Sequence, residues 1–319
     1  MDQKLIVSSS PHLGAKTKTR NIMLDVIIAL IPALIASVIF FGPRTILVVL
    51  ATVAACVLAE YVCRKVMKRN STVGDFSAIV TGMLLAFNLP SGIPIWMAVL
   101  GGIIAIVVVK QMFGGLGQNF VNPALAARII LMTSFPTAMT TWPRPLEWLH
   151  GSSVDAVSSA TPLALIAAGN SADVPGYMDL FLGNRGGCLG ETCILALIIG
   201  GLYLMIRKVI SPIIPVVYIG VVAVFSAILG QDPLMQILSG GLFLGAIFMA
   251  TDYVTSPLTN KGKVIYAVGC AIITVMIRTF GSLPEGVSFS IIIMNILTPH
   301  IENLTAPKAF GAKKEVTRQ

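Results

Sequence analysis

Apolar residues along this chain gather into ten segments that are separated by short polar stretches. The segments span residues 22–41, 45–63, 75–89, 93–112, 119–134, 192–206, 209–229, 233–250, 263–280 and 286–301. An α-helix needs about 20 apolar residues to cross a bilayer, so several of these segments are short for a full crossing. Others contain Gly, Pro or Asn, which backbone buried in a membrane tolerates only next to protein or a cavity. The pattern predicts an all-α polytopic membrane protein with about ten transmembrane helices, some of them short or broken.

The same pattern divides the chain into two similar halves. Phe113-Gly114-Gly115-Leu116 follows the fourth segment, and Phe280-Gly281-Ser282-Leu283 follows the ninth; Gln118 and Glu285 come at the same offset, and Gly82 and Gly245 lie at similar places in the third and eighth segments. Five spans in each half would place the second half upside down relative to the first, which is typical of inverted-repeat membrane proteins. The alternative is that Phe-Gly turns recur by chance in a glycine-rich chain. We predict an N-terminal segment over 1–21, membrane repeats over 22–134 and 192–301, a connecting loop over 135–191 and a tail over 302–319.

Composition supports lipid as the solvent. Of the 319 residues, 55% are hydrophobic and only 11% are charged, whereas soluble domains have about 25% charged residues. The net charge of +8 does not indicate nucleic acid as a partner, because the basic residues lie between apolar segments and at the ends. The five cysteines include no Cys-x-x-Cys pair and have no histidine cluster beside them, so we predict no metal site.

The basic residues also predict which side each loop faces. With the N-terminus in the cytoplasm, the loops on that side hold most of the lysines and arginines, and the C-terminal tail is there as well. This distribution follows the positive-inside rule. It places both termini in the cytoplasm and the loop over 135–191 on the extracytoplasmic side. Loops of this length in compact proteins are usually functional or disordered.

The most informative stretch of the long loop is Ser158-Ser159-Ala160-Thr161-Pro162. Thr followed by Pro before an apolar run predicts a helix start, with Thr161 as the N-cap and Pro162 as the first helical residue. A helix N-terminus offers free N–H groups and the positive end of a dipole, which favour a phosphate. A threonine hydroxyl at that position could therefore carry a phosphoester.

Ser158-Ser159-Ala160-Thr161 resembles the flavinylation motif of the D subunits of Rnf electron-transport complexes and of the related B subunits of sodium-pumping NADH:quinone reductases. That motif reads Ser/Asp-Gly-Ala-Thr, and its Thr bears FMN through the phosphate; this chain departs from it with Ser159 in place of Gly. Further stretches resemble the family in the same order along the chain: 81–90 (TGMLLAFNLP), 114–124 (GGLGQNFVNPA), 190–192 (GET), 249–257 (MATDYVTSP), 278–281 (RTFG) and 285–289 (EGVSF).

The resemblance implies a membrane component of a prokaryotic translocase, in the cell (inner) membrane, that is not catalytic alone. Such a complex moves electrons between ferredoxin and NAD⁺ and couples this to Na⁺ or H⁺ transport, and the expected partners are the A, B, C, E and G subunits of the Rnf complex. A D subunit would carry covalent FMN on Thr161, and the quinone-reductase relatives suggest a second, non-covalent riboflavin or FMN. The alternative function is a small-solute channel or transporter without a redox role, because inverted repeats are also common among transporters.

Polar residues within or beside the predicted spans are the remaining candidates for function. A charged side chain within a span costs about 2.5 kcal/mol or more to insert, so each needs a reason. Arg128 lies inside the fifth span and is the candidate for contacting a cofactor. The candidates for an ion path are Asp25, Asp75, Asn88, Asn119, Asp252 and Glu285. The structural alternatives are interface snorkelling or ion pairing for the charged residues, and capping of half-helices for the asparagines.

Overall fold

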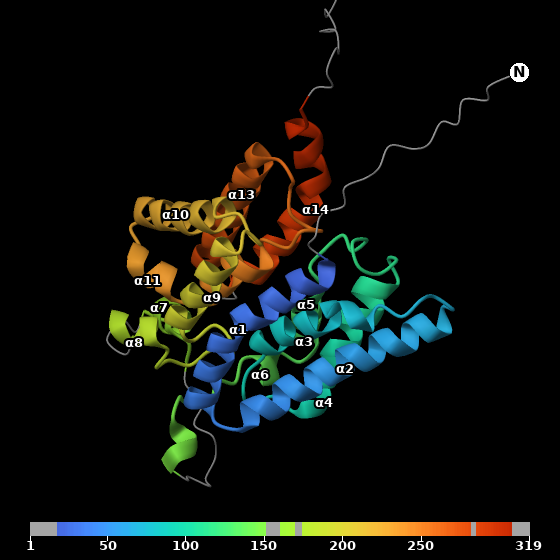
Figure 1. Ribbon diagram of the computed structural model, residues 1–319. Coiled ribbons are helices and arrows are strands. Elements are labelled where there is room, and N and C mark those ends of the chain that lie inside the picture. The colour runs from blue at the N-terminus through green and yellow to red at the C-terminus, as the bar shows by residue number, and fades with distance from the viewer. Residues whose placement is uncertain (1–17, 151–159, 170–173, 282–284, 308–319) are drawn as a thin grey trace, which may run out of the picture.

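The computed structural model describes residues 18–150, 160–169, 174–281 and 285–307, and all regular structure in these ranges is helical (Figure 1). This confirms the predicted all-α class. Ser158 and Ser159 lie outside the described residues. Three helices, α1, α2 and α13, are long and apolar enough to cross a membrane by themselves, and five further apolar helices are shorter, at 10–17 residues. The expectation of short spans is therefore confirmed.

The first half of the chain forms one group of helices. It contains α1 (Thr19–Phe41), α2 (Arg44–Val66), η1 (Val73–Asp75), α3 (Ser77–Phe87), α4 (Ile95–Ile103), η2 (Ile104–Gln111) and α5 (Pro123–Ser134). The segment η2 continues α4 with π-helical geometry, which is rare and frequent at functional sites. The start of α5 follows from its sequence: the Asn122 side chain accepts from the backbone N–H groups of Ala124 and Leu125, and Pro123 occupies the first helical position.

The second half also forms a group of helices, but its π-helical segment lies in the third of its predicted spans and not in the fourth. It contains α9 (Ile194–Ile206), α10 (Ile213–Ile228), α11 (Pro233–Leu238), α12 (Leu242–Leu244), η5 (Gly245–Met249), α13 (Asn260–Phe280) and α14 (Val287–Thr305). The segment predicted as a single span over 233–250 is divided at Ser239-Gly240-Gly241. Gly240 has a φ of 66°, a left-handed conformation that glycine adopts without strain. The break leaves two short helical pieces, with α11 ending in backbone carbonyls that need partners.

Between the halves lies the loop predicted over 135–191, whose described parts hold α6 (Pro136–Met139), η3 (Glu147–His150), α7 (Pro162–Ala167) and α8 (Tyr177–Leu182). Figure 1 shows the first half, in blue to teal, beside the second half, in yellow to red, with α7 and α8 at one side. The halves contact each other through α1 with α9 and through α5 with α14. At Gly200 of α9 the backbone approaches so closely that an added Cβ would clash with the carbonyl oxygen of Ala29.

The repeated glycines do not make equivalent contacts. A Cβ on Gly82 would meet Val53 of α2, whereas a Cβ on Gly245 would meet Val287 of α14. Gln118 and Glu285 also differ, because Gln118 is exposed and Glu285 is buried. The two halves therefore differ in packing at these positions. The inverted orientation of the second half stays a prediction.

Candidate functional site

Thr161 is the N-cap of α7, as its sequence predicted. Its backbone is extended, its side-chain oxygen accepts from the N–H of Ala164 at 3.3 Å, and Pro162 is the first helical residue. Thr161 is 6% exposed, and Ala160 before it is exposed. The hydroxyl oxygen serves only as an acceptor in this hydrogen bond. Replacing its proton by a phosphoryl group would leave the cap's acceptor in place.

Arg128 of α5 and Glu285, which precedes α14, form a buried ion pair that joins the two halves. The guanidinium also donates to the Asn88 side chain at 3.1 Å, to the Ser288 hydroxyl at 2.7 Å and to the Cys188 sulfur at 3.4 Å. Arg128, suggested by the sequence for cofactor contact, and Asn88 and Glu285, suggested for an ion path, thus belong to one network. The donors of both terminal nitrogens of Arg128 are used within the protein, and contact with a cofactor stays a prediction for this residue.

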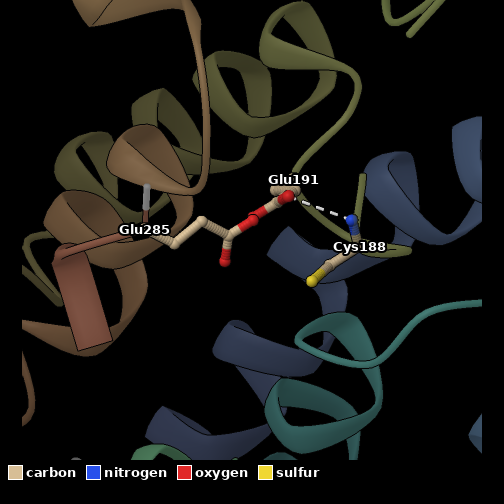
Figure 2. Close-up of side chains that lie close together, drawn as sticks. All are labelled: Cys188, Glu191 and Glu285. Atoms are coloured by element: carbon tan, nitrogen blue, oxygen red, sulfur yellow. Dashed lines mark hydrogen bonds between the residues drawn. The ribbon is translucent and has the colours of Figure 1, made fainter. Parts of the chain in front are cut away.

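Cys188, Glu191 and Glu285 converge beside this ion pair (Figure 2). One ligand atom from each, a sulfur and two carboxylate oxygens, lies within 4.8 Å of the others, and all three residues are buried. Figure 2 shows the carboxylate of Glu285 extending toward that of Glu191, whose Oε1 accepts from the backbone N–H of Cys188 at 2.9 Å. Oε2 of Glu191 is buried and has no hydrogen-bond partner among the described residues. Arg128 already provides a cation to this group, so the geometry does not call for a metal ion.

Two more buried arginines, Arg185 and Arg278, bind backbone carbonyls at the break that follows α11. Arg185 donates to the carbonyls of Leu238, Glu191 and Gly240, at 2.5, 2.7 and 3.3 Å. Arg278 donates to the carbonyls of Gln236 and Ser239, at 2.6 and 3.1 Å. These carbonyls include the last ones of α11, which have no partner within the helix. Sequence reasoning missed both residues as site candidates, because one lies in the long loop and the other at the end of a span.

The remaining ion-path candidates lie apart from this cluster. Asp25 accepts from the Tyr203 hydroxyl at 2.9 Å and from Arg207 at 3.3 Å, so its partners are on α9 and at its C-terminal end. Asp75 accepts from the backbone and hydroxyl of Ser77, at 2.9 and 2.6 Å, at the start of α3. Both contacts fit the structural alternative of pairing and capping.

Asn119 and Asp252 line a cavity of about 110 Å³ that lies between the halves. Its wall includes residues of α1, α3, η2, α5, α9 and η5, and it is mainly apolar, with Lys110 and Asn122 among its polar members. Asp252 accepts from the Thr255 hydroxyl at 3.1 Å. Burial raises the pKa of the Asp252 carboxyl, and the hydrogen bond from Thr255 opposes this effect.

A second buried ion pair, between Glu60 of α2 and Lys110 of η2, was not among the predicted site residues. The ammonium lies 3.1 Å from Oε2 of Glu60 and donates to the Ser77 hydroxyl at 2.6 Å. Glu60 also accepts from Gln111 and Thr72, at 2.9 and 2.6 Å. Glu60 lies inside a predicted span and carries the same insertion cost as Arg128, which is the signal that could have identified it. The network ties the π-helical η2 to α2 and α3.

Comparison with known proteins assigns the chain to a family. A model of the NQR2, RnfD, RnfE family matches residues 6–311. The chain is 50% identical to the D subunit of the Na⁺-translocating ferredoxin:NAD⁺ oxidoreductase complex of Acetobacterium woodii, an alignment that covers 97% of this chain and 96% of the relative. It is 42% identical to the D subunit of the proton-translocating ferredoxin:NAD⁺ oxidoreductase complex of Clostridium ljungdahlii, over 97% and 96% of the two chains. It is 38% identical to the D subunit of the ion-translocating oxidoreductase complex of Stutzerimonas stutzeri, over 93% of each. This chain is therefore a membrane protein of the NQR2, RnfD, RnfE family.

Proposed function

We propose that this chain is the D subunit of an ion-translocating ferredoxin:NAD⁺ oxidoreductase, and that it carries FMN on Thr161. The similarity to three D subunits of such complexes over nearly the whole length of the chain carries the first part of the proposal. The cap geometry of Thr161, which is compatible with a phosphoester, supports the second. Bound there, FMN would supply one- or two-electron transfer through its isoalloxazine ring, while the protein positions it and sets its electrostatic surroundings.

Further parts of the proposal concern the complex around this chain. The partners are the A, B, C, E and G subunits, and electrons pass between the flavin on Thr161 and other centres, including an FMN on the G subunit at the outer face. Both termini lie in the cytoplasm of a prokaryotic cell, and the loop over 135–191 lies outside its inner membrane. These statements rest on the family resemblance and on the distribution of basic residues.

We also propose the cavity between the halves as the place of a second, non-covalent flavin. Its mainly apolar wall suits the isoalloxazine ring, and Lys110, Asn119 and Asn122 offer hydrogen-bond partners. Ala124 lines the cavity and is buried, so Ala124→Trp would fill part of the space. We expect denaturation to release flavin from the purified chain and Ala124→Trp to abolish that release. Equal release from both proteins would contradict this assignment.

The flavin on Thr161 is tested by in-gel fluorescence and by mass spectrometry of the peptide spanning 145–185. We expect a fluorescent band under denaturing conditions and an FMN phosphoester on Thr161, in a host that contains the flavin transferase. Thr161→Ala removes the acceptor oxygen and should give a dark band. Thr140→Ala is the matched control, because Thr140 is an exposed threonine of the same connection. An unmodified peptide from the native complex would contradict the proposal, and solute flux through such an unmodified chain would favour the transporter alternative.

A further inference from the structure

Among the described residues, the buried charges around Glu191 and Glu285 do not balance. Three arginines (Arg128, Arg185 and Arg278) and two glutamates (Glu191 and Glu285) are each at most 8% exposed. The titratable groups that act on Arg185 are Glu191, Glu285, Cys188 and Cys193, and those that act on Arg278 are Tyr218, Glu285, Glu191 and Arg185. With both glutamates ionised and the thiols and tyrosine neutral, the described residues of the cluster have one positive charge in excess.

The excess charge belongs to the arginines that have no carboxylate partner among the described residues. Arg128 forms an ion pair with Glu285, whereas the partners of Arg185 and Arg278 are backbone carbonyls and the side-chain oxygen of Gln236. The Nε atoms of both arginines are buried without a hydrogen-bond partner in the described part of the chain. An uncompensated charge in a protein interior costs several kcal/mol. The cluster is therefore suited to a nearby anion that the described residues do not supply.

The helix that begins at Thr161 lies against this cluster. Gly240 separates them: a Cβ on it would lie 2.8 Å from Cδ1 of Leu163 and 3.0 Å from a terminal nitrogen of Arg278. Leu163 is two residues after Thr161 and is 4% exposed, so α7 is packed onto the break that Arg185 and Arg278 hold. A group attached to Thr161 would be tethered two residues from this contact.

Resting on the proposed function, we infer that the positive charges of Arg185 and Arg278 stabilise the negative charge of the flavin carried by Thr161. The phosphoryl group provides a permanent negative charge, and reduction of a flavin adds electrons that nearby positive charge stabilises. Both arginines are positioning residues, because they act through space and through the backbone of the break. The consequence is a higher midpoint potential for this flavin than it would have beside a neutral cluster.

The test is a redox titration of the Thr161 flavin in the purified complex, followed by its absorption, after in-gel fluorescence has shown that the flavin is attached. Arg278→Gln removes one positive charge and should shift the midpoint potential to more negative values. Arg278→Lys keeps the charge and should restore most of the wild-type potential. Arg44→Gln is the control for loss of a positive charge elsewhere, because exposed Arg44 also donates to backbone carbonyls, those of Gly92 and Ile93, but lies outside the cluster.

A second variant separates charge from structural damage. Glu191→Gln removes a negative charge, keeps the carbonyl oxygen that can accept from Cys188, and leaves the backbone carbonyl that Arg185 binds. We expect a shift to more positive potential, opposite in sign to that of Arg278→Gln. Unchanged potentials, or shifts of the same sign in both variants, would overturn the inference. A wild-type chain that shows no fluorescence would instead contradict the proposed function.

Discussion

The ion pair between Arg128 and Glu285 shows how a buried charge affects the stability of this protein. Both side chains are at most 9% exposed, and the pair joins α5 to the segment before α14. Removing one partner of a buried pair costs about 3–5 kcal/mol, because the other charge stays in the interior without compensation. We therefore expect Glu285→Gln to lower the midpoint of thermal unfolding strongly, as measured by size-exclusion chromatography of heated detergent-solubilised protein.

The control for this prediction is the pair between Asp25 and Arg207. The side chain of Arg207 is 56% exposed there and that of Asp25 is 11% exposed, so solvent screens this pair more than the buried one. Arg207→Gln should therefore lower the unfolding midpoint less than Glu285→Gln, because the Tyr203 hydroxyl still donates to Asp25. Equal decreases of the unfolding midpoint in the two variants would mean that burial does not determine how much these ion pairs stabilise the protein.

The sequence identified individual residues of the site but not their grouping. Arg128 and Glu285 stood out separately, since a charge in or beside a span needs a reason, yet they are 157 positions apart and nothing local links them. The cap at Thr161 was predictable because an N-cap contacts only residues within the first turn of its helix, and Thr-Pro before an apolar run is a local signal for it. Arg185 and Arg278 were missed because their role, donating to the end of α11, exists only once the chain is folded.

At the scale of elements, the contact between α1 and α9 depends on glycine. A Cβ on Gly200 would clash with the carbonyl oxygen of Ala29, so any side chain must push the helices apart. Close approach at small residues is a main source of helix association in membranes. We expect Gly200→Val to weaken the association of the two halves, seen as faster limited proteolysis of the chain and a lower unfolding midpoint.

Gly220 of α10 provides the matched control for Gly200. A Cβ there would meet nothing within 4 Å, so Gly220→Val introduces the same side chain into a helix without a clash. Its stability should stay near that of the wild type. Comparable losses at the two positions would show that helix propensity, and not the close contact, determines the effect.

Hydrophobic runs in the sequence predicted where the helices lie. They did not predict where a helix is interrupted. The predicted span over 233–250 is divided into α11, α12 and η5 because Gly240 takes a left-handed conformation and two arginines bind the freed carbonyls. Adjacent glycines at 240 and 241 were a visible signal for a break. The arginines that make the break tolerable come from residues 185 and 278, and no local rule connects them to it.

At the scale of the whole molecule, the path of one broken segment determines how the two halves lie relative to the membrane. Basic residues place both termini on one side. The broken segment over 233–250 decides the count of crossings. If it crosses, the loop before α13 is cytoplasmic; if it enters and returns, that loop is extracytoplasmic.

Labelling with a membrane-impermeant thiol reagent distinguishes these two topologies. Thr140 and Lys261 are both exposed, the first after α6 and the second at the start of α13. In a background with Cys63→Ser and Cys193→Ser, we expect Thr140→Cys to be labelled in intact cells and Lys261→Cys only after permeabilisation. This result requires α11, α12 and η5 together to cross the bilayer, as the inverted repeat demands. Labelling of both cysteines in intact cells would make that segment re-entrant and would contradict five crossings in the second half.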